Sequence, residues 1–64
     1  MEKRAIDFYK DKKVKLVQYP KFVLMGKITE VFDDCIRFKT KTQESLIDFK
    51  AIKEISFING SEED

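Results

Sequence analysis

The sequence predicts a mostly β protein, in which a short N-terminal helix precedes a strongly bent, five-stranded antiparallel barrel. Residues 14–58 contain short apolar runs that alternate with polar residues and end in brief polar turns, which is typical of β-strands. The isolated Gly26 within one of these runs indicates a bend or a bulge. Residues 2–11 instead space their apolar side chains as a helix does.

The N-terminal segment has the pattern of a short amphipathic helix. Ala5, Phe8 and Tyr9 lie at i, i+3 and i+4 spacing, with Ile6 and charged residues at the other positions. This spacing predicts a helix of about two turns over residues 2–11. Because helices shorter than about 12 residues are marginal in water, we expect it to dock against the strands.

Five strands are expected within residues 13–58. The first ends before Pro20, because proline cannot donate a hydrogen bond to a neighbouring strand. The second is apolar on both faces before Gly26, which predicts that the helix or a neighbouring subunit covers its outer face. The sequence Asp33-Asp34 predicts a turn. The last three strands are expected to direct these side chains inward: Ile36 and Phe38, Ile47 and Phe49, and Ile55 and Phe57.

The length of the chain predicts a single small domain that needs a partner. The 64 residues divide into an expected domain over residues 1–58 and a flexible, acidic tail over residues 59–64. Domains of fewer than about 70 residues usually need disulfides, a metal or oligomerisation. One cysteine and no histidine exclude an intramolecular disulfide and a Cys/His zinc site. A homo-oligomer is therefore expected.

Nothing in the sequence predicts association with a membrane. No apolar run approaches the roughly 20 residues that span a bilayer, and the basic first residues are not followed by the apolar region of a signal peptide. The single Cys35 agrees with a reducing compartment. These features predict a cytoplasmic protein.

Charge is distributed unevenly along the chain. Residues 1–27 carry eight basic and three acidic side chains, a net charge of +5, whereas residues 28–64 carry five basic and nine acidic ones, a net charge of −4. A basic face on a nearly neutral protein attracts phosphate, although a solvated surface explains the same charges. The candidate phosphate contacts in the helix and the joint after it are Lys3, Arg4, Lys10, Lys12 and Lys13.

The sequence does not predict an enzyme. It contains no histidine, which is the commonest general base. Cys35 lies beside two aspartates, whose charges disfavour a reactive thiolate. Asp33 and Asp34 lack the further ligands that a metal site needs, and no glycine-rich phosphate loop is present. We therefore expect no catalytic residue, no metal and no cofactor.

The order of Gly26, an alternating apolar run, Phe32, Asp33 and a new strand resembles the first motif of the Sm, LSm and Hfq superfamily of RNA-binding rings. Residues 8–14 are similar to the basic junction between helix and strand of bacterial Hfq, and residues 51–55 match the apolar spacing after its histidine signature. The resemblance implies an SH3-like barrel of the Sm fold. It also implies a hexameric or heptameric homo-oligomer that binds single-stranded RNA, with U- or A-rich sequences as candidates.

The same resemblance places a set of candidate RNA-binding residues on the pore side of such a ring. Cys35 and Arg37 stand where the family has a base-stacking and a base-reading residue, and Lys50 stands where Hfq has its histidine. One additional residue between Gly26 and Asp33 predicts a further bulge. The pore-side candidates are Asp33, Cys35, Arg37, Phe49 and Lys50. Arg37 and Lys50 are expected to contribute more to RNA affinity than Lys21 or Lys27.

Leu46 is the candidate interface residue. It is apolar on the face opposite Ile47 and Phe49, and rings of this superfamily form when the fourth strand of one subunit pairs with the fifth of the next.

Two alternatives to an RNA-binding ring remain open. In one, an SH3-like barrel without the RNA pocket binds other proteins, as the departures at Cys35 and Arg37 favour. In the other, a basic adaptor binds double-stranded DNA through the helix and joint.

Overall fold

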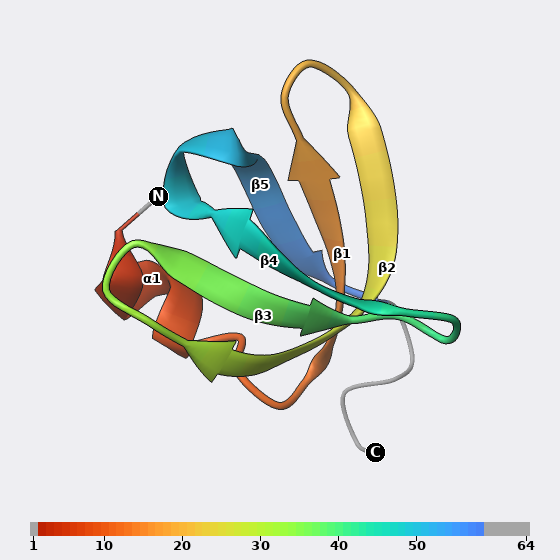
Figure 1. Ribbon diagram of the computed structural model, residues 1–64, viewed down its shortest axis with the longest axis horizontal. Coiled ribbons are helices and arrows are strands. Elements are labelled where there is room, and N and C mark those ends of the chain that lie inside the picture. Colours follow the sequence, from red (N-terminus) through yellow and green to blue (C-terminus); the bar gives the residue numbers. More distant parts are fainter. Residues whose placement is uncertain (1, 59–64) are drawn as a thin grey trace.

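The computed structural model describes residues 2–58, which form a mostly β fold with one five-stranded sheet (Figure 1). The order of the strands is β4-β3-β2-β1-β5, and each neighbouring pair is antiparallel. This confirms the predicted helix followed by five antiparallel strands. The predicted tail, residues 59–64, lies outside the described residues. The elements are α1 (Lys3–Asp7), β1 (Lys13–Gln18), β2 (Phe22–Val31), β3 (Cys35–Lys39), β4 (Glu44–Asp48), the 3₁₀ turn η1 (Phe49–Ala51) and β5 (Ile52–Phe57).

A single apolar core lies between the sheet and α1. The predicted inward positions Ile36, Phe38, Ile47 and Ile55 are buried. The remaining core residues are Ile6, Val14, Leu16, Ile28 and Ile52. No helix within residues 2–58 is long and apolar enough to cross a membrane.

The helix is shorter than the predicted span of residues 2–11. It ends at Asp7, and its buried residue is Ile6 rather than the predicted apolar face, which leaves Phe8 63% exposed. After Asp7 the chain turns repeatedly and reaches Asp11, whose φ of 66° is in the left-handed region. The Asp11 N–H donates to the Ile28 carbonyl at 2.8 Å. A contact with β2 therefore takes the place of the predicted second helical turn. The prediction was wrong because a short helix depends on tertiary contacts, and the spacing of apolar residues does not reveal these contacts.

β2 contains a close approach to β3 at Gly26 and, three residues later, a bulge. A Cβ at Gly26 would lie 2.1 Å from the Lys39 carbonyl oxygen, so only glycine lets β3 approach this closely. The bulge is at Thr29, since Ile28 pairs with Phe38 but Glu30 pairs with Arg37. The bulge predicted between Gly26 and Asp33 is thus confirmed.

Both edge strands depart in detail from the predicted pattern. Phe49 is in η1 rather than in a strand, although it still packs against the core. In β5 the register shifts opposite Val17 and Gln18, so that Ile52 and Ile55, three residues apart, both turn inward. Phe57 is the last residue of β5 and is 39% exposed.

Among residues 2–58, no element covers the outer face of β2. Val23 is 54% and Met25 is 60% exposed, although the sequence predicted burial on both faces. The helix lies instead within the bend made by β2, β3 and their connecting turn (Figure 1). The expected cover from α1 is therefore wrong, and a neighbouring subunit stays a prediction.

Candidate nucleic-acid interface

Three lysines form a row across β1, β2 and β3, the three central strands of the sheet. Lys13 on β1 pairs with Lys27 on β2, and Lys27 pairs with Lys39 on β3. Each is exposed and adjoins a fully buried core residue in its strand, so all three side chains project from the outer face. We call Lys13, Lys27 and Lys39 the lysine row.

Within the lysine row, Lys27 and Lys39 oppose like charges across β2 and β3, which disfavours the pairing of these two strands. Directly opposed side chains have Cβ atoms about 4.5–5.5 Å apart, and like charges at this separation disfavour the pairing of the strands. Among the described residues, neither Lys27 nor Lys39 makes an ion pair with a carboxylate. A bound polyanion would remove this repulsion, because phosphates placed between the lysines neutralise them.

A surface groove of about 600 Å³ contains the whole lysine row. Lys41 adds a fourth ammonium group, and no acidic side chain is among the described residues that line the groove. The remaining lining residues are Met25, Gly26, Thr29, Thr40 and Ile58. Threonine hydroxyls and lysines are groups that contact phosphate and sugar, and the exposed Met25 offers an apolar surface to a base.

A tightly hydrogen-bonded turn holds Lys41 at the end of this groove. The Thr40 N–H donates to the Gln43 carbonyl at 2.8 Å, and Thr40 Oγ1 accepts hydrogen bonds from the N–H groups of Thr42 and Gln43 at 3.3 and 3.2 Å. A side-chain oxygen that accepts from the following backbone fixes such a turn. The position of Lys41 relative to Lys39 is therefore defined by the backbone.

Three of the predicted pore-side residues come together, but in an acidic setting. Asp33, Phe49 and Lys50 line a pocket of about 410 Å³ with Asp34 and Asp48. The Phe49 N–H donates to the Asp34 carbonyl at 3.0 Å, which joins η1 to the β2–β3 turn. Three carboxylates beside one ammonium group repel phosphate, so this pocket is a poor site for an RNA backbone.

The other two pore-side candidates lie on β3 and are engaged by their neighbours. Arg37 forms an ion pair with Glu30, and its guanidinium carbon is 5.5 Å from the centroid of the Phe32 ring. Desolvation, followed by the charge of Asp34, raises the pKa of the half-buried Cys35 thiol, which disfavours the thiolate. We therefore expect a larger contribution to RNA affinity from Lys27 than from Arg37, the reverse of the order predicted from sequence.

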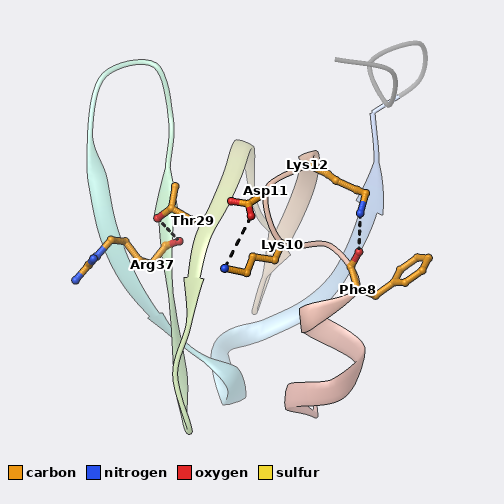
Figure 2. Close-up of polar contacts among 6 residues, drawn as sticks. All are labelled: Phe8, Lys10, Asp11, Lys12, Thr29 and Arg37. Carbon is orange, nitrogen blue, oxygen red and sulfur yellow. Dashed lines mark hydrogen bonds and ion pairs between the residues drawn. The ribbon is translucent and has the colours of Figure 1, made fainter.

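The basic helix and joint do not form one continuous surface. Lys3 pairs with Asp33 at 3.7 Å, and Lys10 pairs with Asp11 at 3.8 Å (Figure 2). The Lys12 ammonium donates to the Phe8 carbonyl at 3.5 Å and lies 5.8 Å from the centroid of the Phe8 ring. Arg4 is exposed on α1. Of these predicted residues, Lys13 alone lines the groove.

Sequence reasoning missed Lys27, Lys39 and Lys41 as members of a single site. Their signal in the sequence is weak, because Lys27 and Lys39 lie on different strands and in different halves of the charge distribution, and Lys41 lies in the turn after β3. Only the register of antiparallel strands brings Lys13, Lys27 and Lys39 side by side.

Within residues 2–58, no group of three metal-ligating side chains lies close enough together to hold a metal ion. No protein-family model, curated protein or solved structure matches the chain. Function has to be inferred from the chemistry of the chain's own residues.

Proposed function

We propose that this protein binds single-stranded RNA, with the sugar-phosphate backbone lying along the lysine row. The observation that carries the proposal is the in-register placement of Lys13, Lys27 and Lys39 in a groove whose described lining contains no carboxylate. Directly opposed like charges lower the stability of a sheet. A polyanionic ligand that neutralises the lysines gives a functional reason for their presence. No catalytic step and no cofactor is part of this proposal.

The proposal includes an SH3-like barrel of the Sm type that assembles into a homo-oligomeric ring. Its support is the strand order, in which β4 and β5 are the two edges of the sheet. An edge strand presents unpaired backbone groups, and pairing β4 of one copy with β5 of the next satisfies both edges at once. Such a head-to-tail contact closes into a ring when the rotation between subunits permits.

The direct test replaces the two central lysines of the row. Lys27→Gln/Lys39→Gln is expected to lower the affinity for oligo(U) and oligo(A) at least about tenfold, because each charged hydrogen bond contributes roughly 1.5–3 kcal/mol. The slope of log K against log[salt] should become shallower by about 1.4, at roughly 0.7 per lost phosphate contact. Fluorescence anisotropy at several salt concentrations measures both quantities.

Three controls make this test specific. Lys21→Gln/Lys53→Gln removes the same charge from exposed positions outside the groove and should leave the salt slope unchanged. Thermal unfolding should show equal or higher stability for Lys27→Gln/Lys39→Gln, because like-charge repulsion is relieved. If Arg37→Gln and Lys50→Gln abolish binding while the groove variant binds like the parent, the pore-side site is correct and the groove is not.

Ring assembly has a separate test at Leu46, which is 61% exposed on the edge strand β4. Leu46→Asp is expected to dissociate the oligomer at micromolar concentration, because it places a charge in an apolar contact between subunits. Light scattering or native mass spectrometry measures the mass. Phe22→Asp is the matched control, since Phe22 is 64% exposed on the interior strand β2 and alternates with Val23 and Met25 rather than sharing their face. A parent that is a folded monomer contradicts the ring.

The acidic pocket supports a second candidate, a module that binds other proteins. The pocket of about 410 Å³ is lined by three carboxylates, from Asp33, Asp34 and Asp48, and by one ammonium group, from Lys50. A basic peptide therefore fits the negative charge of this pocket better than RNA does. Absence of binding to every oligonucleotide at low salt, together with binding of a lysine-rich peptide that Asp34→Asn/Asp48→Asn weakens, would establish this candidate instead.

A further inference from the structure

Three aromatic rings form a cluster at the end of the sheet, outside the groove. The ring centroids of Phe8 and Tyr9 are 5.4 Å apart, those of Phe8 and Phe57 are 5.7 Å apart, and those of Tyr9 and Phe57 are 4.9 Å apart. We call Phe8, Tyr9 and Phe57 the aromatic cluster. Tyr9 is partly buried against the core, whereas Phe8 is 63% exposed.

The backbone around Phe8 is fixed, so its exposed ring has a defined position. The Tyr9 N–H donates to the Ile6 carbonyl at 2.9 Å, and the Lys12 N–H donates to the Tyr9 carbonyl at 3.2 Å. Edge contacts from Tyr9 and Phe57, at interplanar angles of 86° and 64°, support the ring from the protein side. A ring held in place in this way loses little conformational entropy when a ligand stacks on it.

A cation accompanies the exposed ring. The Lys12 ammonium lies 5.8 Å from the centroid of the Phe8 ring, and Figure 2 shows the ring extending away from the strands beside Lys12. An aromatic face next to an ammonium group is the combination that receives one nucleotide, with its base on the ring and its phosphate at the lysine.

The aromatic cluster and the groove meet at the same end of β1 and β5. Phe57 pairs with Val14, which follows Lys13 of the lysine row. Ile58 follows Phe57, lines the groove, and donates its N–H to the Lys13 carbonyl at 3.4 Å. A strand of nucleic acid that leaves the groove at Lys13 has its shortest way to Phe8 around this end of the sheet, past Ile58 and Phe57.

We propose that Phe8, supported by Tyr9 and Phe57, is a base-stacking site that selects unpaired nucleotides over a duplex. This inference rests on the proposed function, because the lysine row supplies the phosphate contacts and the aromatic cluster receives a base beyond them. Bases within a duplex are stacked on each other and do not present a free face to a protein ring. The lysine row by itself binds any polyanion, and the ring adds the discrimination.

Phe8→Leu tests the stacking site while keeping an apolar side chain. Affinity for oligo(U) and oligo(A) should fall about tenfold, because a stacked base typically contributes roughly a five- to hundredfold gain in binding. Affinity for heparin should stay unchanged, and the salt slope should also stay unchanged because no charge is removed. Phe22→Leu is the matched control, since Phe22 is 64% exposed and lies outside the cluster.

A second variant gives a direct signal of stacking. The chain contains no tryptophan, so Phe8→Trp introduces a unique fluorophore. Single-stranded oligo(A) should quench its emission, whereas heparin and a duplex RNA of equal length should not. The same tryptophan placed by Phe22→Trp should respond to none of them.

The outcomes separate this inference from the proposed function. If Phe8→Leu binds oligonucleotides like the parent and Phe8→Trp is not quenched, the stacking site is wrong, while the effect of Lys27→Gln/Lys39→Gln still decides the function. Equal loss of heparin and RNA binding in a Phe8→Leu protein that melts like the parent also overturns the stacking site, because it shows that Phe8 supports the charged groove and does not contact a base. Preference of the parent for duplex over single strands contradicts it directly.

Discussion

Replacing Phe38 by alanine is expected to remove a large part of the protein's free energy of unfolding and to lower its melting temperature. Phe38 is fully buried and is among the largest of the fully buried side chains. Truncating a buried phenylalanine costs about 3–5 kcal/mol in free energy of unfolding. A domain of this length has a total stability of only about 3–10 kcal/mol, at roughly 0.05–0.15 kcal/mol per residue. The loss is therefore comparable to the whole stability.

Circular dichroism during thermal unfolding measures this loss. Phe22→Ala is the matched control, because it deletes the same atoms from a side chain that is 64% exposed, and surface substitutions usually change stability by less than about 0.5 kcal/mol. A Phe38→Ala protein that melts within a few degrees of the parent would mean that the core tolerates the cavity by collapsing around it, contrary to the expectation.

Gly26→Ala is expected to lower the free energy of unfolding by about 3 kcal/mol, the upper end of the usual cost of overpacking. The added methyl group would lie 2.1 Å from the Lys39 carbonyl oxygen and 3.2 Å from Cε2 of Phe38. Because the first of these atoms belongs to the backbone, no side-chain rotation relieves the clash. β2 and β3 must separate where Lys27 pairs with Lys39.

This separation links stability to binding. Gly26→Ala should weaken affinity for oligo(U) even under conditions where the protein remains folded, because it displaces two lysines of the row relative to each other. Chemical denaturation measures the stability, and anisotropy at low temperature measures the affinity. Val23→Ala, an exposed position on the same strand, should change neither. An unaltered melting curve for Gly26→Ala would show that the strands are further apart than the structure places them.

The period of the apolar residues predicted the β elements and most of the core. Ile36 and Phe38 alternate with polar neighbours and are buried, and the exposed Leu46 was expected on the opposite face from Ile47. A period of two directs successive side chains to opposite faces in any strand, so this information is local. The Asp33-Asp34 turn was also predicted from local residues alone, and the structure has it, with the Phe32 N–H donating across the turn to the Cys35 carbonyl at 2.8 Å.

The errors fall where a residue's environment comes from a distant part of the chain. Helical spacing predicted a helix through Asp11, but α1 ends at Asp7, and the Asp11 N–H donates a hydrogen bond to the Ile28 carbonyl on β2 instead. Two apolar faces predicted that Val23 and Met25 are covered, yet α1 packs elsewhere and both remain exposed. Intrinsic propensity is weak over so few residues, and tertiary contacts decide the result.

The sequence by itself determined that this protein is a small β fold with a short N-terminal helix and a bulge between Gly26 and the Asp33-Asp34 turn. The tertiary structure alone decided which charges act together. Lys13, Lys27 and Lys39 are separated by more than ten residues along the chain, but antiparallel pairing places them opposite each other. Register depends on the turns and bulges of every intervening strand. A local pattern of charges contains none of that information.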